Sequence, residues 1–170
     1  MRAARVVLAA LAVFVTDHLG PAVYADDHDK ATIGAVEWVG IPAAGITLLA
    51  RVDTGAASSS LDARDIRVRG PRGAQTVRFA LLRDDGRRVV LELPLAEYRS
   101  VSTSDSRSER RPVVRLAICV AGQQFEADLT LNDRSHMEHR MLLGRQALAG
   151  RFLVDVDRSH VAPPTCPETR

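Results

Sequence analysis

The residues best suited to do chemistry are Asp53-Thr54-Gly55-Ala56, which directly follow the apolar run of residues 46–52. Such a run predicts a buried strand, and the glycine predicts a tight turn after it. A carboxylate at this junction projects from the end of a strand into open space. The alternative is structural: the Asp53 side chain only closes an Asx turn.

A second apolar run that ends at a glycine lies near the C-terminus, in Met141-Leu142-Leu143-Gly144-Arg145. A strand ending in Asp-Thr-Gly-Ala and a later Leu-Leu-Gly-Arg together resemble one lobe of an aspartic peptidase. With residues 51–63, 109–115 and 132–135 as further matching blocks, the chain resembles the bacterial retropepsin-like family often labelled ATP-dependent zinc proteases. The resemblance spans roughly residues 36–156.

This resemblance implies that Asp53 is the catalytic carboxylate and that its loop is supported by Thr54, Gly55 and Ala56. Thr54 is expected to hydrogen-bond across a two-fold axis, or else to make ordinary turn contacts. Gly55 is expected to allow a positive φ and to leave room for backbone N–H groups to approach the carboxylate. The family usually carries a basic residue after Asp-Thr-Gly-Ala, where this chain has Ala57 and so lacks any contact of that basic side chain.

The later block is expected to support this loop. By the resemblance, Leu143 and Gly144 pass beneath it in the core, and Arg145 begins a short helix. The arginine is expected to brace the dimer, and the alternative is a surface cation.

One carboxylate is not enough for the peptidase reaction that the resemblance implies. One carboxylate must take a proton from water, and a second, protonated one must donate to the substrate carbonyl. Two carboxyls about 3 Å apart share one proton and so supply both roles. The chain has room for one lobe, so we expect a homodimer in which each protomer contributes Asp53. The expected function is an exported aspartic endopeptidase acting on peptide or protein substrates; the alternative is a catalytically silent peptide-binding or regulatory module on the same fold.

Zinc and ATP, which the family label names, have little support among the residues, and we expect no cofactor. The chain has no Gly-x-x-x-x-Gly-Lys-Ser/Thr phosphate loop. His136 and His139 are three residues apart, whereas a metallopeptidase helix spaces its histidines by four. We therefore expect a solvated polar turn and no metal site, with a zinc-dependent hydrolase as the weakest alternative.

Short strand-like segments separated by turns dominate the chain and indicate an all-β fold. They cover residues 31–39, 46–52, 58–61, 66–69, 76–82, 88–93, 113–120 and 124–131, with a helix at 145–148. Together with the resemblance, this predicts a retropepsin-like closed β-barrel lobe with one short C-terminal helix.

Residues 98–111 show no apolar periodicity and are expected to form an exposed loop. The resemblance places residues 100–109 where retroviral proteases carry a flap. A mobile lid is therefore expected, and a disordered connector is the alternative.

The N-terminus predicts a cleaved signal peptide over residues 1–25. Arg2 and Arg5 precede the apolar residues 6–15, and a cut before Asp26 suits the small residues there. The alternative is an uncleaved anchor. We expect a lead-in at 26–35, a peptidase domain at 36–157 and a Pro-rich tail at 158–170. The mature protein is expected to be periplasmic or secreted, with no stable membrane span.

Two further features bear on partners and redox state. The formal net charge of +2 over 170 residues argues against a dedicated nucleic-acid binder. The two cysteines, Cys119 and Cys166, would meet an oxidising compartment after export, so they either form a disulfide or remain as two thiols.

Overall fold

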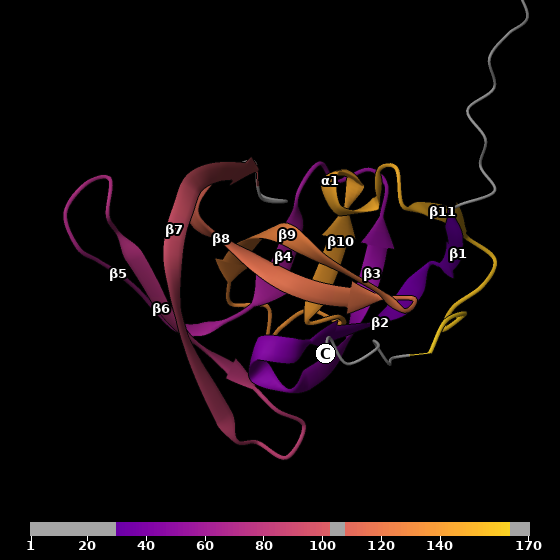
Figure 1. The fold of residues 1–170 in the computed structure, drawn as a ribbon, viewed down its shortest axis with the longest axis horizontal. Helices are drawn as coiled ribbons and strands as arrows, with labels where there is room; N and C mark the ends of the chain where they lie inside the picture. Colours follow the sequence, from indigo (N-terminus) through magenta and orange to yellow (C-terminus); the bar gives the residue numbers. More distant parts are fainter. Residues whose placement is uncertain (1–29, 103–107, 164–170) are drawn as a thin grey trace, which may run out of the picture.

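The computed structural model describes residues 30–102 and 108–163. Figure 1 shows a barrel of strands with a second group of strands extending from one side. The predicted signal peptide, its cleavage point and Cys166 lie outside the described residues. Cys119 is buried on its strand and is disulfide-bonded.

Eleven strands and one four-residue α-helix make up the described part of the chain. In chain order they are β1 (Ala31–Gly34), β2 (Val36–Ile41), β3 (Ile46–Asp53), β4 (Ser59–Asp62), β5 (Arg64–Arg69), β6 (Thr76–Leu82), β7 (Arg88–Ser102), β8 (Ser108–Val120), β9 (Gln123–Asn132), β10 (Met141–Gly144), α1 (Arg145–Leu148) and β11 (Phe152–Asp155), with a 3-10 turn at Pro42–Ala44.

Six of these strands close into a barrel in the order β2-β3-β10-β4-β9-β8. The barrel closes where β2 pairs with the end of β8, with Val39 opposite Val120. Alternate residues of β3 point inward, because successive side chains of a strand face opposite sides. Burying each large aliphatic side chain of this kind contributes about 1.5–3 kcal/mol. The all-β, retropepsin-like barrel with one short helix is confirmed.

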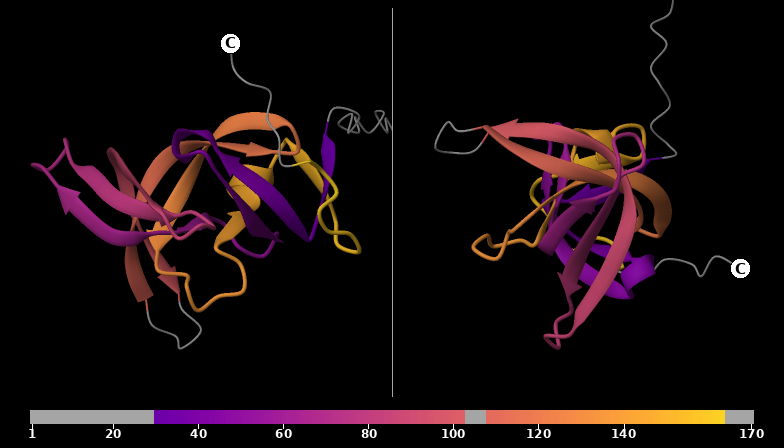
Figure 2. Two further views of the ribbon diagram at one scale, coloured as in Figure 1. Left: turned by 90° about the horizontal axis from the view of Figure 1, so that it is seen from below. Right: turned by 90° about the vertical axis from the view of Figure 1, so that its left-hand side faces the viewer.

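The strand β7 belongs to both the barrel and the side sheet. Its first half pairs with β6, which pairs with β5, and its second half pairs with β8, from Leu95 opposite Val114 to Ser102 opposite Ser108. Figure 2 shows β5 and β6 standing away from the barrel.

The pairing of β7 with β8 corrects one expectation. Residues 98–102 and 108–111 form a β-hairpin, so the interpretation as a loop or disordered connector is wrong for them. The ladder needs no apolar periodicity there because its side chains pair by charge: Arg111 bonds to Glu109, and the Arg110 guanidinium lies 3.9 Å from the ring centre of Tyr98. Residues 103–107 lie outside the described residues, and the mobility of the hairpin stays a prediction.

The first and last strands of the described part, β1 and β11, contribute Ile33 and Phe152 to the hydrophobic core. β1 runs parallel to β11, with Ala31 opposite Phe152, in a separate two-stranded sheet. The buried carboxylate of Glu37 accepts the N–H groups of Gly34 at 2.7 Å and Val161 at 2.9 Å. The described residues of the expected lead-in and tail, near 31–35 and 158–162, therefore both contribute to the packed structure.

Within residues 30–102 and 108–163, no helix has the length and apolar content needed to cross a membrane.

Candidate active site

Asp53 and Gly144 lie side by side because the chain places β10 between β3 and β4. β10 runs parallel to β3, and Gly144 is directly opposite Asp53 in the ladder. On its other side β10 pairs with β4, with Met141 opposite Leu61. The residues that connect β3 to β4, together with Asp53 itself (residues 53–58, the Asp loop), therefore pass over the end of β10.

The Asp53 carboxylate is held by its own loop. Its Oδ1 accepts the backbone N–H of Gly55 at 2.9 Å and that of Ala56 at 3.1 Å. This is an Asx-type turn, and Asp53 is half-buried within it. The φ of Gly55 is not positive, so that expectation is wrong. The absence of a side chain still matters, because a Cβ at Gly55 would lie 3.2 Å from Asp53 Oδ1. Thr54 is exposed, and its contact across a two-fold axis stays a prediction.

Gly144 allows β10 to approach the backbone of the Asp loop closely. A Cβ on this residue would lie 2.5 Å from the carbonyl oxygen of Ser58 and 3.0 Å from that of Ala56. The Gly144 N–H donates to Ser59 Oγ at 3.1 Å. Leu143 is fully buried in the barrel core, so the Leu-Leu-Gly strand supports the loop from below.

Arg145 fastens the Asp loop within its own chain. Its Nη1 donates to the carbonyl oxygens of Thr54 at 2.9 Å and Gly55 at 2.7 Å, and its backbone N–H donates to Ala56 at 2.9 Å. The guanidinium thus acts as an intrachain brace. A further role of Arg145 in bracing a dimer remains a prediction.

Arg99, on the β7–β8 hairpin, is a contact that the sequence reasoning missed. Its Nη1 donates to Ser58 Oγ at 2.9 Å and to Gln146 Oε1 at 3.0 Å, and it also pairs with Glu97. The hairpin is therefore tied to both the Asp loop and α1. A sequence signal was present: Glu-x-Arg occurs at 97–99 and again at 109–111, a spacing that places Glu and Arg on one face of a strand.

Two adjoining clefts run from the Asp loop beneath the hairpin. The near cleft, of about 360 Å³, is lined by Ala56, Ala57, Ser58, Ser60, Ser100, Val101, Ser102, Arg111, Thr130, Arg134 and Leu142. The far cleft, of about 470 Å³, is lined by Val101, Ser102, Glu109, Arg111, Asn132, Asp133, His136 and Met137. They share Val101, Ser102 and Arg111, and together they form one groove that begins at the Asp loop.

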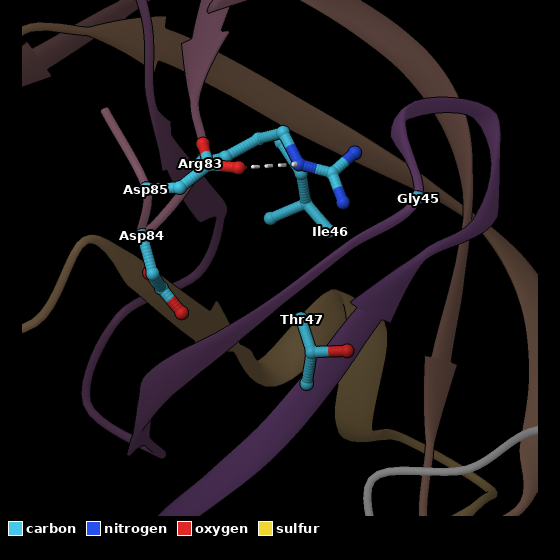
Figure 3. A pocket seen from close by; sticks show the side chains of 6 residues that line it. All are labelled: Gly45, Ile46, Thr47, Arg83, Asp84 and Asp85. Atoms are coloured by element: carbon cyan, nitrogen blue, oxygen red, sulfur yellow. Dashed lines mark ion pairs between the residues drawn. The ribbon is translucent and has the colours of Figure 1, made fainter. Parts of the chain in front are cut away.

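A separate hollow of about 280 Å³ lies near the start of β3, and Figure 3 shows its lining, with Arg83 facing Asp85 at 4.0 Å. Asp53 is at the other end of this eight-residue strand, about 20 Å away at the rise of an extended chain. This hollow is therefore not part of the candidate site.

The loop after β9 forms the far wall of the groove and is held by a buried carboxylate. Asp62, 2% exposed, accepts the backbone N–H of Arg134 at 2.8 Å and the Nε of Arg140 at 3.2 Å. Within the loop, the hydroxyl and then the N–H of Ser135 lower the pKa of Asp133 to about 2. The loop is thus fastened at both ends.

The histidines expected in a polar turn lie in this same loop. His136 lines the far cleft, and His139 lies 3.8 Å from Glu138. Within the described ranges, no group of three or more His, Cys, Asp or Glu side chains could hold a metal ion.

A closed barrel whose Asp-Thr-Gly-Ala loop rests on a Leu-Leu-Gly strand defines the chain as a retropepsin-like protein. The chain belongs to the RimB-like family, whose model, described as retropepsin-like aspartic endopeptidase RimB, matches residues 32–165.

Curated relatives share more than a third of their aligned residues with this chain. A protein of Shewanella pealeana is 38% identical over 135 residues, and one of Parasynechococcus marenigrum is 39% identical over 136. Both are named "Probable alpha-L-glutamate ligase". The matches cover 77% of this chain but only 30% and 29% of those relatives, so the chain spans about three tenths of their length.

A solved structure has a similar fold. The crystal structure of Lpg0085, a protein of unknown function from Legionella pneumophila, superposes with a TM-score of 0.67 at 27% identity. The match covers 77% of this chain and 97% of that one.

Proposed function

We propose that this protein is an aspartic endopeptidase that hydrolyses peptide bonds with two Asp53 side chains brought together in a homodimer. The observation that carries the proposal is the Asp loop: its carboxylate lies at the end of β3 and accepts two N–H groups, Arg145 fastens the loop, and Ala56, Ala57 and Ser58 of the same loop line the near cleft. A catalytic group held this rigidly needs little reorganisation during the reaction.

In the proposed reaction the two Asp53 carboxyls share one proton. The ionised member takes a proton from water, which attacks the carbonyl carbon of the scissile bond, and the protonated member donates to the carbonyl oxygen. The tetrahedral species then collapses, and the leaving amine takes a proton from the dyad. The groove beneath the β7–β8 hairpin would hold the peptide on one side of the dyad.

Acidic, glutamate-containing peptides are the substrate class that we propose. The relatives are named "Probable alpha-L-glutamate ligase", and this chain matches about three tenths of their length. A peptidase domain within the same chain as such a ligase would meet glutamate-bearing chains. The charged residues that line the near cleft are Arg111 and Arg134, which suits an acidic ligand. Ligase activity is not proposed for this chain.

The second candidate is a peptide-binding module that has lost turnover. The exposed site lacks a second carboxylate within one protomer, so a protein that stayed monomeric would bind peptides without cutting them. We also propose export of the mature protein, on the strength of the pattern in residues 1–25.

Replacing the carboxylate tests the assignment. Asp53→Asn is expected to lower turnover of a cleaved peptide by at least about 100-fold, because an amide cannot accept the proton of water. Its circular dichroism and melting temperature should remain close to those of the wild type. A chelator is expected to leave wild-type turnover unchanged.

Asp65→Asn is the matched control, because Asp65 is exposed on β5 and has a positive φ that asparagine tolerates. Full turnover by Asp53→Asn would end the peptidase proposal. Peptide binding without cleavage by the wild-type dimer would favour the silent module.

A further inference from the structure

Arg134 is a buried arginine whose tip faces the near cleft. The residue is 6% exposed and lines that cleft. Its backbone N–H bonds to Asp62, and its side-chain Nε donates to the carbonyl oxygen of His139 at 3.2 Å. For its two Nη groups, the described part of the chain offers no hydrogen-bond acceptor.

Arg140 and Arg145 each have an Nη group that donates to an acceptor of the protein, whereas the Nη groups of Arg134 do not. Arg140 donates to Asp62 and to the carbonyl oxygen of Leu82, and Arg145 donates to two carbonyl oxygens of the Asp loop. In the described part of the chain no buried side-chain nitrogen lacks a partner, so the Nη groups of Arg134 are open to the solvent of the cleft and can donate to a bound acceptor. Because the backbone of Arg134 is fixed and its Nη groups are open, we expect their hydrogen-bond acceptor to belong to a ligand bound in the cleft.

Arg111 adds a second positive charge to the same cleft. Its side chain is largely buried, and its Nε and Nη2 both bond to one oxygen of Glu109, at 2.8 and 2.6 Å. Burial, and then the positive charge of Arg111, lower the pKa of Arg134, while Asp62 opposes the shift. The two guanidinium groups therefore repel each other, and an anion bound in the near cleft would neutralise their positive charges.

Glu109 is held only loosely in comparison. Its side chain is 53% exposed, it lines the far cleft, and it bonds to Arg111 through a single oxygen. The Glu109 member of this ion pair is in contact with solvent, so Glu109 can move into water provided that another anion takes its place on the largely buried Arg111. A carboxylate that reached both arginines would gain stronger, charge-assisted hydrogen bonds in a drier setting.

We propose that Arg134 and Arg111 form a subsite for a side-chain carboxylate of the bound peptide, and that Glu109 occupies Arg111 until the substrate carboxylate replaces it. The subsite lies beside Ala56 to Ser58, so it takes a residue close to the scissile bond. This rests on the proposed function for its ligand, a peptide, and assigns the residues that select it.

A binding comparison in Asp53→Asn protein tests the subsite without requiring cleavage. Two peptides are used that differ only by glutamate or glutamine, with that residue scanned along positions near the scissile bond. At one of the scanned positions, the glutamate peptide is expected to bind at least about tenfold more tightly than the glutamine peptide. In this background Arg111→Gln is expected to abolish the difference. Glu109→Gln should tighten the glutamate peptide several-fold and leave the glutamine peptide unchanged.

Arg134→Gln is expected to remove the same preference, but a buried site can fail to fold, so the exposed Glu109→Gln variant keeps the test decisive. Arg67→Gln, an exposed arginine of β5, is the control and should change neither affinity. Equal affinities at every scanned position, or a Glu109→Gln effect of equal size on both peptides, would overturn the subsite. If wild-type protein cut both peptides equally well, the subsite would fall and the peptidase would stand. If the glutamate peptide bound preferentially but the wild-type protein cut neither peptide, the peptidase proposal would fall and the subsite would stand.

Discussion

At the scale of single residues, the account depends on how Asp53 is held. The carboxylate accepts two N–H groups of its own loop, and Arg145 fixes that loop by its Thr54 and Gly55 carbonyl oxygens. These contacts join parts of the chain about 90 residues apart. A catalytic carboxylate needs this rigidity because small displacements from the reacting geometry are costly in rate.

Arg145→Met tests the brace. The substitution keeps most of the side-chain length but removes the donors to the Asp loop, and the residue is exposed, so the fold should survive. We expect a stability loss of about 1 kcal/mol and a fall in turnover of about tenfold or more. Arg87→Met, at the exposed β6–β7 turn, is the control for losing an arginine. Wild-type turnover by Arg145→Met would show that the brace is dispensable.

Asp53 and the Leu-Leu-Gly-Arg block could be found from sequence because their signals are local: an apolar run, a glycine and a charged residue in fixed order. The contacts of Arg99 and Arg134 could not be assigned in this way, although the Glu-x-Arg spacing marked Arg99. Arg99 bonds to a serine hydroxyl and a glutamine side chain of other elements, and Arg134 bonds to a carbonyl oxygen of its own irregular loop. Such contacts exist only after the strands have paired.

At the scale of elements, β10 is the strand that positions the site. It is only four residues long, yet it pairs with both β3 and β4 and passes under the Asp loop. The strand pattern along the chain predicted most of the barrel, because apolar runs such as that of β3 lie between turn residues. The second half of β7 was missed, since its polar side chains pair by charge and carry no apolar period.

Gly144→Ala tests the close approach of β10. The added Cβ would collide with the backbone of Ser58, which cannot move without shifting the Asp loop. We expect a loss of about 1–3 kcal/mol in the free energy of unfolding and a larger fall in turnover than that loss explains. Gly122→Ala is a matched control: its φ of 76° makes alanine costly, by about 1 kcal/mol or more, but no atom lies within 4 Å of its Cβ. If both variants kept full activity at a permissive temperature, β10 would not position the loop.

The loop after β9 gives a pH prediction. Ser135 is the main cause of the lowered pKa of Asp133, about 2. Since the folded pKa lies below the unfolded value of about 3.9, the stabilisation is present above about pH 4 and is lost as pH falls through about 2. Ser135→Ala should raise the pKa of Asp133 toward its ordinary value. An NMR titration of that carboxyl carbon measures this, and an unchanged pKa would refute the assigned cause.

At the scale of the whole molecule, one chain supplies one Asp53 carboxylate, whereas the proposed reaction requires two. The barrel, the Asp loop and the groove are all contained in a single chain of the RimB-like family. Dimerisation stays a prediction from chemistry, made because no second Asp-Thr-Gly exists in the sequence. The surface through which two chains would meet could not be predicted, since it depends on exposed residues without a local sequence signal.

The most direct test of the shared dyad is a subunit-mixing experiment. Wild-type chains are titrated with Asp53→Asn chains under conditions of exchange, and cleavage per wild-type chain is measured while heterodimers are counted by native mass spectrometry. With a ninefold excess of mutant, only about one tenth of wild-type chains remain in wild-type homodimers at statistical exchange. The account predicts that activity per wild-type chain falls to about that level, because a heterodimer has one carboxylate and one amide. Constant activity per wild-type chain, with heterodimers verified, would mean that each protomer carries a complete site and would contradict the shared Asp53 dyad.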